Sequence, residues 1–324
     1  MLMRLLLKRM MFASFVVALT LSTIGLVQAQ VVETDDQAKI DIYTRFVNNR
    51  VTNEAAAYQA AREYLAKYPK DDDAYTRYLK PWVALYDKWE RKQRVPQLIY
   101  DQNNFVEGYR LGKQVLAEEP NDLATLMYLG YGAYLASTSA KNESFNAEAR
   151  GYAQKAIAAI ESGKAPDEWK PFKDKTDALA RLYYTLGFID FRSNPSQAID
   201  SFIKTTQLES DLKKAPSTYY FIAAAYETGL YKTLAAAYEA NFAGKPESPA
   251  SKAALEKLNL VIDRMIDAYA RAIAAAGNDP ANAQNKAQWM TSLTNYYKFR
   301  HDGLDTGLSE LIAGAMAKPL PPKP

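Results

Sequence analysis

Apolar residues recur along the chain with the spacing of one face of an α-helix. From Val31 to Lys318 they fall at i, i+3, i+4 and i+7 and are rich in Ala, Leu and Tyr, and no run of β-branched residues alternates with period two. In one such segment Asn53 can cap a helix that Pro69 ends. Another runs from Ala253 to Ala276 and stops at Gly277. The pattern predicts an all-α fold.

Prolines divide this helical sequence into segments of ordinary helix length. About ten helices would fill the intervals, which is too many for one simple bundle. Pairs of helices stacked in a row are the natural alternative. We expect inserted loops near residues 86–103, 136–148 and 161–176. The breaks fall at Pro69, Pro96, Pro120, Pro166, Pro195, Pro216, Pro246 and Pro280.

The first 29 residues have the composition of a secretory signal peptide. Three basic residues, Arg4, Lys8 and Arg9, precede an apolar stretch from Met10 to Val27, and small residues at 27 and 29 suit cleavage after Ala29. An uncleaved N-terminal anchor is the alternative, because the apolar stretch is close to the lower length limit for a membrane span. We therefore expect a periplasmic or secreted protein with no integral membrane span after cleavage.

Composition excludes several kinds of site. The chain has 40 Lys and Arg and 37 Asp and Glu, so removing the three basic residues of the leader leaves 37 of each sign. A neutral body has no general electrostatic footprint for nucleic acid. The chain has no Cys, which rules out thiolate chemistry. Its single His is His301, so a site that needs two imidazoles is also ruled out. No motif indicates a metal or a cofactor, and Ser201 to Lys204 matches Ser-X-X-Lys without its companion motifs.

Small residues inside the helical segments form a repeat signal. Leu186-Gly187-Phe188 lies within one segment, and Ala198, Phe202 and Thr205 lie inward on the next. This pattern resembles a tetratricopeptide repeat. In that family the first helix carries a large residue, Leu-Gly and an aromatic, and a second helix of this kind follows. A small residue has a mechanical reason here, since two helices can cross closely only where one offers little more than backbone. Partial matches surround Gly130, Ala223, Ala272, Leu293 and Ala61.

The repeats are irregular. Gly130 and Gly187 are 57 residues apart, whereas Gly187 and Ala223 are 36 apart, close to the family period of about 34. We therefore expect an irregular α/α array of tetratricopeptide-like helix pairs over residues 30–317, followed by an extended, flexible Pro-rich tail at 318–324. An unrelated α/α array is the alternative.

The resemblance implies a concave face made by the first helix of each pair. Aromatic residues there offer a large contact area with little rotamer entropy to lose, which suits a peptide or a partner helix. The same aromatic stripe would also fit a buried core. The positions carried over from the family are Met127, Tyr131, Tyr134, Arg181, Tyr184, Phe188, Phe191, Tyr220, Glu227, Met290 and Tyr297.

The sequence favours a non-enzymatic scaffold module that binds a protein or peptide partner in the cell envelope, with Arg181 and Glu227 fixing the direction of the guest. Two alternatives remain open. A small-molecule or glycan binder would stack sugar rings on tryptophans such as Trp82, Trp89, Trp169 and Trp289. An α/α hydrolase would use two carboxylates that are distant in sequence, which no local motif reveals.

Overall fold

The computed structural model describes residues 35–324, which form α-helices with short 3-10 and π-helical turns and contain no strand. The all-α prediction is confirmed for this part of the chain. The expected signal peptide lies outside the described residues. Where the sequence suggested one domain over 30–317, the described chain divides into two compact units, residues 35–94 and Val95–Pro324, which are treated separately below.

The first unit is made of three helices around an aromatic core. Asn53 caps the second helix as expected, because its side-chain oxygen accepts a hydrogen bond from the backbone N–H of Ala56 at 3.1 Å. Asp73 caps the third in the same way, accepting from Thr76 at 2.7 Å. Phe46 and Trp82 meet edge to face in the core, with ring centroids 5.0 Å apart. The helices are α2 (Asp35–Asn49), α3 (Glu54–Lys67) and the part of α4 (Ala74–Pro96) that ends at Arg94.

The loop expected near 86–103 is mostly helix, so that expectation was wrong. Helix α4 continues to Pro96, and a π-helical turn η1 follows over Gln97–Asp101. The segment from Lys88 to Gln93 is rich in straight-chain residues that lose little side-chain freedom in a helix, which explains why helix persists there. The segment near 161–176 is a long connection as expected, between Glu161 and Lys175.

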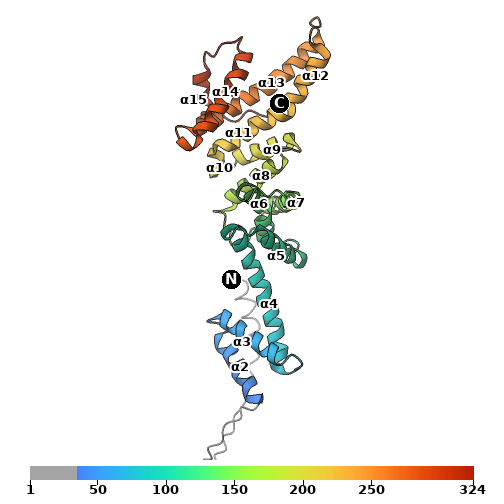
Figure 1. The fold of residues 1–324 in the computed structure, drawn as a ribbon, viewed down its shortest axis with the longest axis vertical. Helices are drawn as coiled ribbons and strands as arrows, with labels where there is room; N and C mark the ends of the chain where they lie inside the picture. The colour runs from blue at the N-terminus through green and yellow to red at the C-terminus, as the bar shows by residue number, and fades with distance from the viewer. Residues whose placement is uncertain (1–34) are drawn as a thin grey trace, which may run out of the picture. The chain divides into compact units, whose positions relative to one another are not determined.

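In the second unit, helices pack against their neighbours in chain order (Figure 1): α6 contacts α7, α7 contacts α8, α8 contacts α9, α9 contacts α11, α11 contacts α13, and α13 contacts α14. The helices of this unit are α5 (Phe105–Glu118), α6 (Leu123–Ser139), α7 (Asn146–Glu161), α8 (Lys175–Asp190), α9 (Pro195–Thr206), α10 (Asp211–Lys214), α11 (Pro216–Tyr226), α12 (Lys232–Phe242), α13 (Pro249–Ala276), α14 (Ala283–Arg300) and α15 (Leu308–Gly314).

Two glycines that the sequence singled out, Gly130 and Gly187, lie where helices of this unit pack closely. A Cβ atom added at Gly130 would lie 3.0 Å from both the Cα and the backbone N of Ala153, so α6 and α7 meet backbone to backbone. A Cβ at Gly187 would lie 2.8 Å from the ring of Phe202, which packs from α9 onto α8. Ala198, Phe202 and Thr205 are fully buried, as the repeat pattern expected.

Helix packing departs from a regular repeat between α11 and α13. A π-helical turn η2 (Glu227–Tyr231) and helix α12 intervene there, and α13 is 28 residues long. This insertion separates the first-helix pattern around Ala223 from the second-helix pattern around Ala272, both of which are buried. The local pairing that the motifs predicted is present where α8 packs on α9 and α13 packs on α14. The tetratricopeptide assignment stays a resemblance.

Candidate protein-interaction face

Aromatic side chains of α6, α8, α11 and α14 in the second unit touch one another in a continuous series. Tyr134 on α6 meets Tyr184 and Phe188 on α8 edge to face, with ring centroids 5.3 Å apart in each case. Edge-to-face packing places the positive rim of one ring on the negative face of another. We call the series the aromatic ladder; its rings are those of Tyr131, Tyr134, Tyr184, Phe188, Phe191, Phe221, Tyr220 and Trp289.

The eleven residues predicted for the face differ in accessibility. Met127 and Tyr184 are buried, with 0% and 2% of their surface exposed, and so offer a guest almost no surface in this state. Tyr131 and Tyr297 are also buried, at 9% and 7%. The other seven are half-buried: Tyr134, Arg181, Phe188, Phe191, Tyr220, Glu227 and Met290. The face is thus part core and part surface.

The structure brings most of these residues together but separates two. Met127 lies in the core between α6, α7 and α8. Tyr297 belongs to the C-terminal end of the unit, where its hydroxyl donates to the carbonyl of Thr306 at 2.8 Å and its ring stacks on His301 at 4.0 Å. His301 itself is exposed at the end of α14, as expected for a turn residue. Neither Met127 nor Tyr297 is a member of the aromatic ladder.

Arg181 is held within the protein. Its Nε donates to both carboxylate oxygens of Asp177, each at 3.0 Å, and its Nη1 donates to the hydroxyl of Tyr131 at 3.0 Å. The guanidinium also lies 5.5 Å from the Tyr131 ring centroid, a cation–π contact. Burial opposes its charge, but the hydrogen bonds that Arg181 donates to these partners, with their charges, outweigh burial and raise the pKa of Arg181. Arg181 therefore fixes Tyr131 in place.

Glu227 holds two further tyrosines in place, as Arg181 holds Tyr131. It begins the π-helical turn η2, and its two carboxylate oxygens accept hydrogen bonds from Tyr269 and Tyr296, both at 2.6 Å. Burial and these bonds to a carboxylate raise the pKa of both tyrosine hydroxyls, so they stay protonated. Tyr220 lies 6.5 Å from Tyr269, ring to ring, which connects this cluster to the ladder.

Phe221 is the central residue that the sequence analysis missed. Its ring lies 6.2 Å from Phe188 and 5.4 Å from Phe191, and it stacks on Phe202 at 5.4 Å. Phe221 directly follows Tyr219 and Tyr220, so three consecutive aromatics point in three directions around α11. A helix that is apolar all round is one packed on several sides, and that signal could have identified Phe221.

The tryptophans bear on the glycan hypothesis. Trp82 and Trp289 are buried, with 2% and 6% exposed, so their faces are covered by protein rather than open to a sugar ring. Trp169 is half-buried against the core around α7 and α8, and Trp89 is 37% exposed on α4. Stacking on sugar would therefore depend on Trp89 and Trp169 alone among the four.

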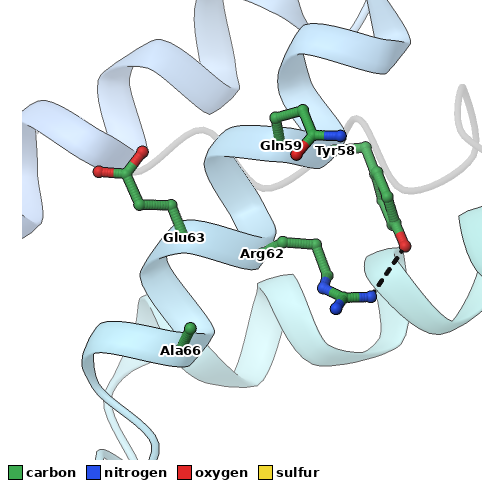
Figure 2. Close-up of a pocket in the computed structure, with 5 residues that line it drawn as sticks. All are labelled: Tyr58, Gln59, Arg62, Glu63 and Ala66. Carbon is green, nitrogen blue, oxygen red and sulfur yellow. Dashed lines mark hydrogen bonds between the residues drawn. The ribbon is translucent and has the colours of Figure 1, made fainter.

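A shallow hollow of about 500 Å³ lies along α3 in the first unit. Figure 2 shows its lining residues Tyr58, Gln59, Arg62, Glu63 and Ala66. Three of its polar side chains already have protein partners. Arg62 donates to the Tyr58 hydroxyl at 3.0 Å, Tyr58 donates to Asp87, and Glu63 pairs with Arg45 at 2.8 Å. We assign no function to this hollow.

Within residues 35–324, no group of three or more His, Cys, Asp or Glu side chains is arranged to hold a metal ion. Nor does any helix of the same range combine the length and the apolar character needed to cross a lipid bilayer.

Fold and face together define an all-α chain with sequentially packed helix pairs and a partly exposed aromatic face. No protein-family model matches the chain, and neither the curated proteins nor the solved structures contain a match to it. Its function must therefore be argued from its own residues.

Proposed function

We propose that the chain is an exported, non-enzymatic protein-interaction module that holds a peptide segment or a partner helix on the half-buried part of the aromatic ladder. The observation that carries the proposal is the contact of Phe188 on α8, and of Phe191 directly after α8, with Phe221 on α11, all three of them half-buried. A wall of rings from separate helices is already ordered before a guest arrives, so binding loses little side-chain entropy.

We give the two charged residues a different role from the one expected, which was to fix the direction of a guest. Arg181 and Glu227 are each engaged by protein partners, so we assign them to positioning the tyrosines around the face rather than to direct contact with a guest. The specificity of the face then depends on shape and on apolar contact, with the hydroxyls of its half-buried members Tyr134 and Tyr220 as polar groups.

The test begins with selection of binding peptides from an unbiased displayed library, using the full chain as bait. The affinity of a selected peptide is then measured for the wild-type chain and for Phe188→Leu, which keeps an apolar side chain but removes the ring. Phe299→Leu is the matched control, since Phe299 is 61% exposed on α14 and lies outside the ladder.

We expect Phe188→Leu to weaken binding at least tenfold, which corresponds to about 1.4 kcal/mol, and Phe299→Leu to leave binding unchanged. Selection of no peptide, or equal affinity for all three chains, would contradict the proposal. Export is tested separately by N-terminal sequencing of the mature protein, for which we expect a start at Gln30.

A further inference from the structure

The C-terminal tail lies on the protein through contacts that involve nearly every residue. Arg271 is 3% exposed, and its guanidinium donates to the backbone carbonyls of Lys318 at 3.0 Å and Pro319 at 2.9 Å. Arg264 donates to the carbonyl of Pro322 at 2.6 Å. Between these points Leu320 packs against the apolar core of the unit. Both arginines belong to α13.

The end of the tail is held by α9. The Lys323 ammonium donates to the Ser196 carbonyl at 3.1 Å, to the Ser196 hydroxyl at 2.9 Å, and to both carboxylate oxygens of Asp200 at 3.0 Å. The tail thus bridges α9 and α13, whose tail-contacting residues are more than sixty positions apart in sequence. We call the surface formed by Ser196, Asp200, Arg264 and Arg271 the tail groove.

The chemistry of the groove matches that of a proline-rich chain. Proline has no backbone N–H, so residues 318–324, with four prolines, present carbonyl acceptors and few donors. The arginines supply donors to those carbonyls, and the acidic and hydroxyl groups of α9 supply acceptors for the one basic side chain they meet. An extended proline-rich segment also has little conformational entropy to lose on binding.

Arg271 shows most clearly that the tail groove is preorganised to bind a peptide backbone. Its side chain is 4% exposed and also bonds both oxygens of Asp267, at 2.6 and 3.2 Å. A guanidinium this deeply buried needs acceptors on all sides, because an unsatisfied buried donor is costly. Two of these acceptors are main-chain carbonyls of the tail, so Arg271 binds the backbone of an extended peptide rather than a particular side chain.

We propose that the tail groove is a second peptide-binding site, distinct from the aromatic ladder, whose ligand is an extended proline-rich segment of the Pro-Leu-Pro-Pro-Lys kind. The chain's own residues 318–323 are the resident ligand, and a matching segment of another polypeptide competes with them. Because the resident tail is tethered, its effective concentration is in the millimolar range, and a free segment binds well only when the tail is weakened.

The first measurement tests whether the tail docks in solution. The chain has no Cys, so Lys204→Cys on α9 together with Pro324→Cys gives two unique positions for spin labels in the full-length protein. We expect one narrow distance distribution between them, and a broad distribution when Arg264→Ala is added. A broad distribution in the chain that keeps Arg264 would overturn the docking of the tail.

The second measurement tests recognition in trans. A fluorescent peptide with the sequence Lys-Pro-Leu-Pro-Pro-Lys-Pro is titrated against the wild-type chain and against the full-length tail-weakened variant Leu320→Ala, Lys323→Glu. We expect the peptide to bind the variant at least tenfold more tightly than the wild type, because the variant tail competes poorly. A scrambled peptide of the same composition is the peptide control.

A matched pair of groove variants completes the design. In the tail-weakened background, Arg264→Ala should lower the peptide affinity at least tenfold, whereas Arg110→Ala should leave it unchanged, since Arg110 pairs with Glu107 on α5 and has no part in the groove. The proposal is overturned if the scrambled peptide binds equally well, if Arg264→Ala has no effect, or if weakening the tail does not improve binding.

Discussion

Replacing Gly130 by Ala tests whether the helix pairs pack closely because of small residues. Alanine is more favourable than glycine inside a helix by about 1 kcal/mol, so the change would stabilise a helix at a position that faces solvent. At position 130 the new Cβ would lie 3.0 Å from the Cα and N of Ala153. These are backbone atoms and cannot rotate away, so α6 and α7 must separate. Overpacking of this kind costs about 1–3 kcal/mol.

Gly151→Ala is the matched control. Gly151 also lies within a helix, α7, but a Cβ there would meet nothing within 4 Å. We expect Gly151→Ala to raise the free energy of unfolding by about 1 kcal/mol, and Gly130→Ala to fall below this control by the full packing cost of about 1–3 kcal/mol.

Hydrogen exchange of peptides from α6 and α7, read by mass spectrometry, measures this difference locally. The local measurement is preferable because a chain with two compact units need not unfold in one step. Equal protection in the Gly130→Ala and Gly151→Ala chains would refute the reasoning, since it would show that the crossing does not require a side chain as small as glycine.

Two further predictions concern charged and ionisable groups. Arg150→Met leaves the buried Asp190 carboxylate without its ion-pair partner and should cost about 2 kcal/mol at neutral pH, less than for a fully buried pair because Arg150 is partly exposed. Burial already raises the pKa of Asp190, and loss of Arg150 would raise that pKa further, so urea unfolding should show a smaller deficit at pH 4 than at pH 7. Burial raises the pKa of Tyr128 and Tyr226 to about 12, so the folded chain holds these protons above the unfolded pKa of 10, and stability should fall as pH rises beyond 10. Replacing both residues by Phe removes the two ionising hydroxyls, so the variant Tyr128→Phe, Tyr226→Phe should lose its helical ellipticity at a higher pH than the wild-type chain, and the same alkaline midpoint in both chains would contradict this.

Local signals in the sequence correctly predicted the all-α fold and two of the close helix contacts. Asn53 caps α3, and Gly130 and Gly187 lie at close contacts, because capping and small-residue packing depend on neighbouring positions in the chain. The loop predicted near 86–103 is wrong, because a proline can stand at the end of a long helix, as Pro96 does in α4.

Long-range partners could not be predicted from the sequence. Glu227 is bound by tyrosines 42 and 69 residues away, and no local pattern links them. The contacts of the tail have the same character, because Lys323 meets Asp200 across 123 residues. Which members of the aromatic face are half-buried was also beyond periodicity, since a helical stripe of tyrosines fits a core and an open surface equally well.

The central claim is that a guest lies on the half-buried rings of α8 and α11. The most direct test places the photo-crosslinking amino acid benzoylphenylalanine at Phe191 in one full-length chain and at Phe299 in another, and exposes each to a peptide selected by the wild-type protein. We expect a covalent peptide adduct from position 191 and none from position 299. An adduct from position 299 alone, or from neither position while the peptide remains bound, would contradict it.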